Sequence, residues 1–177
     1  MKRNGFSLIE LVVVIAIMVI LMTVGGLAYR NFSQKAGVEG QVKAMYADLM
    51  NARSQALYRK SCRYVTVAGT QFSVYTSSVC GAAAPTTGAI VQKTLKYGIT
   101  STPTDSLCFD QRGVANLVRS ANTDMSGTYK AVCIQQSNPG VVDSVVISAM
   151  GIQMGKLTTG STCSDAPTDN PRHITPQ

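Results

Sequence analysis

Hydrophobic and polar positions divide the chain into stretches of different periodicity. Residues 6–28 hold a single charged side chain, Glu10, and include the unbroken apolar run of residues 11–22. A helix of 23 residues extends roughly 34 Å, and the hydrocarbon core of a bilayer is about 30 Å thick. The pattern therefore predicts a membrane-crossing helix over residues 6–28.

Residues 29–61 follow with an amphipathic pattern. One stripe of apolar side chains recurs at alternating spacings of four and three, which is the period of one face of an α-helix. Its members are Val38, Val42, Met45, Leu49, Ala52 and Ala56. All prolines lie at position 85 or later, so the helix can continue without interruption from the apolar segment. We expect a stem helix over residues 29–61 whose stripe packs on the rest of the chain.

Residues 62–157 change to short runs rich in β-branched and aromatic side chains, which is typical of strands. The expected strands cover residues 63–67, 71–76, 89–97, 107–110, 131–135 and 141–148. Turn chemistry separates them, for example at Gly69-Thr70. One long helix followed by short strands predicts an α+β fold, with an antiparallel β head against the helix. Residues 158–177 are expected to be a loosely held tail.

The apolar N-terminal segment has three explanations. A secretory signal peptide would use the basic start Lys2-Arg3 and a cleavage site after Ala28, so that the mature protein would begin at Tyr29. A plain membrane anchor fits the length of the segment. Neither explains Glu10, because an ionisable side chain in a membrane segment is costly and by default suggests a function. The third explanation rests on the residues around Glu10.

The stretch Gly5-Phe6-Ser7-Leu8-Ile9-Glu10, followed by the apolar run, closely resembles the N-terminal signature of type IV pilins and type II secretion pseudopilins. The resemblance implies that residues 1–5 are a leader, which a prepilin peptidase removes after Gly5, and that the new amine of Phe6 is methylated. It also implies that the Glu10 carboxylate pairs with the Phe6 amine of a neighbouring subunit during assembly. Such a pair offsets the desolvation of both charges, and a carboxylate is favoured near a helix N-terminus.

This resemblance also implies where the protein is found and what it binds. We expect a single-pass protein of the bacterial inner membrane, with its head in the periplasm, that later enters a pilus or a pseudopilus. Its partners would be other pilin or pseudopilin subunits, the prepilin peptidase and the membrane itself.

Three further segments resemble the GspH/FimT group of minor pilins and pseudopilins, whose fold is a long helix against β-sheets. They are Ala52-Arg53-Ser54-Gln55-Ala56, Phe109-Asp110-Gln111-Arg112-Gly113 and the stretch of residues 145–151. Some FimT-like proteins bind DNA during uptake, so a DNA-binding competence pilin is an alternative function. Those proteins have arginines in a Gly-Arg-x-Arg pattern, whereas here Ile152 and Met154 stand in the arginine positions after Gly151. This departure disfavours DNA as a partner.

The formal net charge of +7 is concentrated in the stem rather than the head. Residues 29–63 hold seven basic and two acidic side chains, and residues 64–177 hold seven basic and six acidic ones. The basic side chains are spread around the stem helix, so a solvated surface is the simplest explanation. Anionic lipid and acidic neighbouring subunits are the alternatives.

Five cysteines, Cys62, Cys80, Cys108, Cys133 and Cys163, occur without a CxxC motif or the spacing of a zinc site. Disulfides in an exported head are the better explanation than buried free thiols. The sequence does not determine the connectivity. Our preference is Cys62 with Cys80 across a hairpin, and Cys108 with Cys133 around the intervening loop.

No motif supports catalysis. His173 is the single histidine and lies in the expected tail, and the glycines form no phosphate-binding pattern. We therefore expect a structural protein with no enzymatic activity, cofactor or metal.

Overall fold

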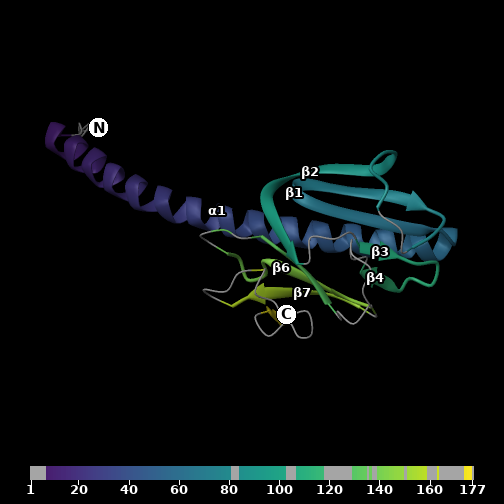
Figure 1. Ribbon diagram of the computed structural model, residues 1–177. Coiled ribbons are helices and arrows are strands. Elements are labelled where there is room, and N and C mark those ends of the chain that lie inside the picture. Colours follow the sequence, from purple (N-terminus) through teal and green to yellow (C-terminus); the bar gives the residue numbers. More distant parts are fainter. Residues whose placement is uncertain are drawn as a thin grey trace.

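The computed structural model describes residues 7–80, 84–102, 107–117, 129–134, 136, 139–149, 151–158, 163 and 174–176. One long helix, α1 (Leu8–Arg59), leads into eight strands. The strands are β1 (Cys62–Ser77), β2 (Ala89–Thr102), β3 (Leu107–Phe109), β4 (Ala115–Leu117), β5 (Tyr129–Cys133), β6 (Ser144–Ser148), β7 (Ile152–Leu157) and β8 (Ile174–Pro176). Figure 1 shows the second half of α1 packed on the strands, while its first half extends away from them.

Helix α1 is continuous over 52 residues, which corresponds to about 78 Å. It passes through Gly25-Gly26 without a break and ends where Lys60 takes a left-handed conformation with φ 50°. All six side chains of the predicted apolar stripe are buried in the core. The predicted α+β fold is thus confirmed, with the long helix packed on an antiparallel sheet.

The eight strands form one sheet in the order β4-β3-β1-β2-β5-β6-β7-β8, and all neighbouring strands are antiparallel. Strand β2 joins the two halves of the sheet. Its first part pairs with β1, and its last residues, 100–102, pair with β5. The sheet therefore reaches from β4 to β8 without a gap between pairs.

Strand β1 reverses direction at its centre. The Arg63 guanidinium donates a hydrogen bond to the Thr76 hydroxyl, and the Cys62 sulfur lies 4.0 Å from the carbonyl oxygen of Ser78. A straight strand would place those ends roughly 50 Å apart. Gly69, at φ 58°, supplies the left-handed residue that the reversal requires. The predicted strands 63–67 and 71–76 are therefore the two arms of a hairpin, with its turn at Gly69-Thr70.

Alternation along the strands separates two faces of the sheet. Leu107 and Phe109 of β3, and Val132 of β5, belong to the core beneath α1. Their neighbours Cys108 and Cys133 belong to two smaller clusters on the opposite face. The helix thus covers one face, and cysteine-containing clusters cover part of the other.

Polar contacts also attach α1 to the sheet. The Gln41 amide accepts a hydrogen bond from the Tyr97 N–H and donates one to the Tyr97 carbonyl, each at 2.8 Å. Lys93 forms an ion pair with Asp48 at 2.6 Å. A Cβ atom at Gly37 would collide with the Tyr97 hydroxyl, so this glycine allows the Tyr97 ring to lie against the helix.

Three strands, β4, β7 and β8, were not expected from the sequence. Strands β4 and β8 have three residues each, too few to show an alternating pattern. Residues 158–177 were expected to be loosely held, but the structure attaches them at two described points. Strand β8 pairs with β7, and Cys163 is bonded to Cys133.

Candidate functional site

The first half of α1 has a fully exposed apolar surface. The large hydrophobic side chains of residues 8–22 are between 41% and 79% exposed. This is the one helix of the described residues that is long and apolar enough to cross a membrane, and its most apolar window is not buried within the chain. The exposed part of the predicted assembly helix therefore has no partner among the described residues of the head, and Figure 1 shows it extending away from the strands.

Glu10 lies in the first turn of α1, on this exposed segment. Ser7 precedes the helix, and its carbonyl accepts hydrogen bonds from the N–H groups of Glu10 and Leu11. Within residues 7–80, no hydrogen bond or ion pair involves the Glu10 carboxylate, and the Ser7 hydroxyl does not cap the helix. The predicted cleavage and methylation residues, Gly5 and Phe6, lie outside the described residues.

The outward face of the stem adds a smaller apolar surface near the end of α1. Met50, Leu57 and Tyr58 are exposed there, and Tyr58 is 90% exposed. Arg53 and Lys60 line the same open hollow. The helix thus presents its buried stripe to the sheet and keeps a mixed apolar and basic surface for contacts outside the chain.

Asp110 organises the turn between β3 and β4. Its Oδ1 atom accepts hydrogen bonds from the N–H groups of Arg112 and Val114, both at 2.9 Å, and Oδ2 pairs with the Arg112 guanidinium at 3.2 Å. Burial alone would raise the pKa of Asp110, but these hydrogen bonds and the Arg112 charge outweigh it and lower the pKa. Gly113 follows at φ 74°, packed against Leu57 of α1. The Phe109 to Gly113 segment therefore has a structural role beneath the helix end.

The predicted disulfide pairing is wrong. The bonds are Cys80–Cys108 and Cys133–Cys163, and Cys62 is a buried free cysteine. Cys108 and Cys133 could not pair, because strands β1 and β2 lie between β3 and β5. Because β1 is a hairpin of two arms, four strand spacings separate β3 from β5 and amount to roughly 19 Å, whereas disulfide Cα atoms lie about 4.4–6.8 Å apart. Sequence reasoning left out Cys163 because it assigned that residue to a loose tail.

The positions compared with the DNA-binding arginines are turned toward the core. Ile152 is 8% exposed, and Met154 packs against the same core. Both side chains lie on the same side of β7, while Lys156 is exposed. Restoring arginine at 152 would place a charge in the core rather than on a surface.

Comparisons with known proteins agree with this geometry. Residues 1–26 match the family model described as the prokaryotic N-terminal methylation motif. The crystal structure of the type IV minor pilin FimU from Pseudomonas aeruginosa, strain PAO1, in space group P21 aligns with a TM-score of 0.51 and 16% sequence identity. The alignment covers 70% of this chain and 91% of FimU.

FimU in space group P65 aligns with a TM-score of 0.48 and 17% identity, over 66% of this chain and 90% of that chain. A search of curated proteins finds no significant match to the sequence.

The chain thus combines a prokaryotic N-terminal methylation motif with a type IV pilin-like fold, in which one apolar N-terminal helix packs on an antiparallel head. The particular resemblance in fold is to a minor pilin, FimU.

Proposed function

We propose that this protein is a minor pilin or pseudopilin that enters a filament through residues 6–28. The observation that carries the proposal is the contrast between the two halves of α1. The apolar side chains of residues 8–22 are exposed, whereas the buried core begins at Val38. Because uncovered apolar surface of this extent needs lipid or another protein, the segment fits a helix that leaves the membrane to join neighbouring helices.

Processing at the N-terminus belongs to the same proposal. Cleavage between Gly5 and Phe6 would remove two basic side chains and create an amine one helical turn before Glu10. The Glu10 carboxylate would then pair with the Phe6 amine of a neighbouring subunit. The absence of an internal partner for Glu10 within residues 7–80 supports an intermolecular role. The head would lie in the periplasm and the precursor in the inner membrane.

The function is tested by replacing Glu10 in cells that assemble the filament. A charge-assisted hydrogen bond contributes about 1.5–3 kcal/mol, so Glu10→Ala should reduce incorporation roughly tenfold or more. Immunoblotting of sheared filaments against the membrane fraction measures the incorporated share. Glu10→Asp is the matched control, since it keeps the charge and should retain a larger part of assembly.

Two results would contradict the proposal. The first is normal incorporation of the Glu10→Ala protein. The second comes from N-terminal sequencing of the mature chain: a start at Phe6 supports a pilin, whereas a start at Tyr29 indicates an ordinary signal peptide.

A further inference from the structure

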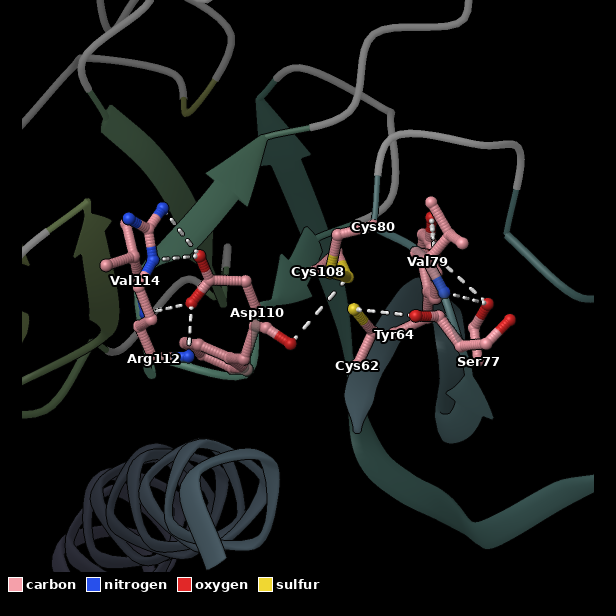
Figure 2. The surroundings of a disulfide bond; sticks show 11 residues. Cys62, Tyr64, Ser77, Val79, Cys80, Cys108, Asp110, Arg112 and Val114 are labelled. Carbon is pink, nitrogen blue, oxygen red and sulfur yellow. Dashed lines mark hydrogen bonds and ion pairs between the residues drawn. A yellow bond between two sulfur atoms is a disulfide. The ribbon is translucent and has the colours of Figure 1, made fainter. Parts of the chain in front are cut away.

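Three sulfur atoms gather on the sheet face opposite α1. The Sγ atoms of Cys62, Cys80 and Cys108 all lie within 4.8 Å of one another, although only Cys80 and Cys108 are bonded. Figure 2 shows the Cys62 sulfur directed toward this disulfide. Cys62 and Cys108 are buried, and Cys80 is partly exposed. The free thiol is therefore within reach of both atoms of an existing bond.

Two separate features of the fold produce this cluster. The reversal of β1 at Gly69 brings Cys62 opposite Ser78, two residues before Cys80. The antiparallel register of β1 with β3 pairs Tyr64 with Cys108, and Cys62 lies two residues from Tyr64 on the same face. The Tyr64 hydroxyl also donates to the Val79 carbonyl at 3.2 Å, which holds the segment before Cys80 in place. Strand pairing thus fixes Cys108, and side-chain contacts from Cys62 and Tyr64 hold the segment before Cys80.

The second disulfide provides an internal comparison. Cys133 and Cys163 share a cluster with Ala131 and Val146, and no other cysteine belongs to it. All five cysteines are among the described residues, so this bond has no third cysteine beside it. The two disulfides therefore differ in that only Cys80–Cys108 has a free cysteine, Cys62, beside it.

We propose that Cys62, Cys80 and Cys108 form an internal thiol–disulfide exchange site. The Cys62 thiolate attacks the sulfur of Cys80 or Cys108, a new disulfide forms to the attacked atom, and the Cys80–Cys108 bond breaks. The expelled sulfur leaves as a thiolate and takes up the proton that Cys62 lost. One disulfide and one thiol are present before and after, so no oxidant or reductant is consumed.

The exchange would change which segments are joined. The Cys80–Cys108 bond connects the segment after β1 to β3. Attack on Cys108 forms a Cys62–Cys108 bond and releases Cys80. Cys62 lies three residues beyond the last residue of α1. Attack on Cys80 instead closes the β1 hairpin and releases Cys108. Exchange therefore determines whether β3 is bonded to Cys80 after the end of β1, bonded to Cys62 near the end of α1, or not bonded to either segment.

Burial keeps Cys62 in its thiol form. Loss of hydration and the nearby Asp110 charge raise the pKa of the Cys62 thiol, against a smaller lowering by a hydrogen bond from the Cys80 backbone. The thiol form therefore predominates at neutral pH, and attack by the thiolate is slow. The Cys80–Cys108 bond seen in the structure is therefore exchanged only slowly.

Redirecting the disulfide tests the site. The full chain in detergent micelles is prepared with Cys108→Ser, exposed to oxidised glutathione, quenched in acid, and mapped by mass spectrometry. We expect Cys62 and Cys80 to form a disulfide, so that the number of free thiols falls from one in the wild type to none. The matched control is Cys163→Ser. It should retain Cys80–Cys108 and leave Cys62 and Cys133 without a disulfide partner in the chain, each as a thiol or a glutathione adduct.

Exchange in the intact cluster is measured on the wild type. Prolonged labelling of the native chain with a maleimide should place label on Cys80 or Cys108, because either can be the released thiol. The Cys62→Ser protein should show no label at those two positions. The proposal is overturned if Cys62 stays unpaired with Cys80 in the Cys108→Ser protein, or if neither Cys80 nor Cys108 is labelled in the wild type.

Discussion

At the residue scale, the turn between β3 and β4 depends on one carboxylate. Asp110 binds two backbone N–H groups and also closes the turn through its own backbone, which accepts from Gly113 and donates to Val114. Its pKa is lowered from the ordinary value of 3.8. Its contribution to stability is therefore complete above pH 3.8 and is lost as the pH falls through the lower pKa of the folded state.

Replacing Asp110 by asparagine should therefore have a pH-dependent effect. Asp110→Asn is expected to lower the free energy of unfolding by about 1–2 kcal/mol at neutral pH, because neutral hydrogen bonds replace charge-assisted ones. The difference from the wild type should shrink below pH 3.8. Urea unfolding at several pH values, followed by tyrosine fluorescence in detergent micelles, measures both quantities. A constant difference down to strong acid would contradict the assigned role.

Asp143 provides a control, because its pKa is shifted in the opposite direction to that of Asp110. Burial raises its pKa, although hydrogen bonds from the Leu157 N–H and Ser144 and the charge of Lys156 partly offset this. An acid whose folded pKa is raised loses stability as the pH rises from the unfolded value through the folded one. Asp143→Asn should remove that loss, so that the free energy of unfolding varies less with pH above pH 3.8. In the same pH range, Asp110→Asn should leave the shape of the pH dependence unchanged.

The cysteines show which parts of the disulfide pattern could be predicted from the sequence. An oxidised head was predictable from residue type and the exported context, and the approach of Cys62 to Cys80 followed from the predicted hairpin. The actual partners were not predictable, because they depend on the strand order, which places β3 next to β1 and separates it from β5 by both arms of β1 and by β2. Cys163 required knowledge that the C-terminal residues return to the sheet.

At the element scale, the buried stripe of α1 holds the helix on the sheet. Leu49 is 2% exposed within the core beneath the helix. Leu49→Ala should lower the free energy of unfolding by about 2–5 kcal/mol through lost burial and a residual cavity. Urea unfolding of the full chain in detergent micelles measures the change.

The neighbouring residue supplies the comparison for Leu49. Met50 lies on the outward face and is 38% exposed, so Met50→Ala should change the stability by about 0.5 kcal/mol or less. Equal losses for the two variants would mean that the stripe does not dominate helix docking.

Elements with a regular spacing of apolar side chains could be predicted from the sequence, and elements defined by tertiary contacts could not. The stripe of α1 repeats over several turns, so both the helix and its buried face follow from the sequence. Strand β7 carries lysine at 156, where a third apolar side chain would complete the alternation of Ile152 and Met154, and β4 is too short for a pattern. These strands exist because β6 and β3 offer adjacent hydrogen-bonding edges.

At the scale of the whole molecule, the head is structurally independent of the apolar segment. Among the described residues, none before Val38 belongs to the buried core. A chain that begins at Tyr29 should therefore remain soluble and monomeric without detergent, retain both disulfides and contain one free thiol. Size-exclusion chromatography, circular dichroism and thiol titration test these expectations.

A shorter fragment is the matched control for this prediction. A chain that begins at Met50 lacks four side chains of the stripe, including Leu49, and should not fold into the same head. Aggregation of the fragment that begins at Tyr29 would instead show that the apolar segment contributes to the stability of the head.

The two outer strands of the sheet, β4 and β8, have three residues each. Long exposed edges template pairing with other chains, whereas very short ones give little opportunity for it, and Pro176 in β8 has no N–H to donate. The two ends of the sheet therefore give neighbouring molecules little backbone to pair with, whereas residues 89–99 of β2 pair with β1 alone among the described strands and leave a longer open edge.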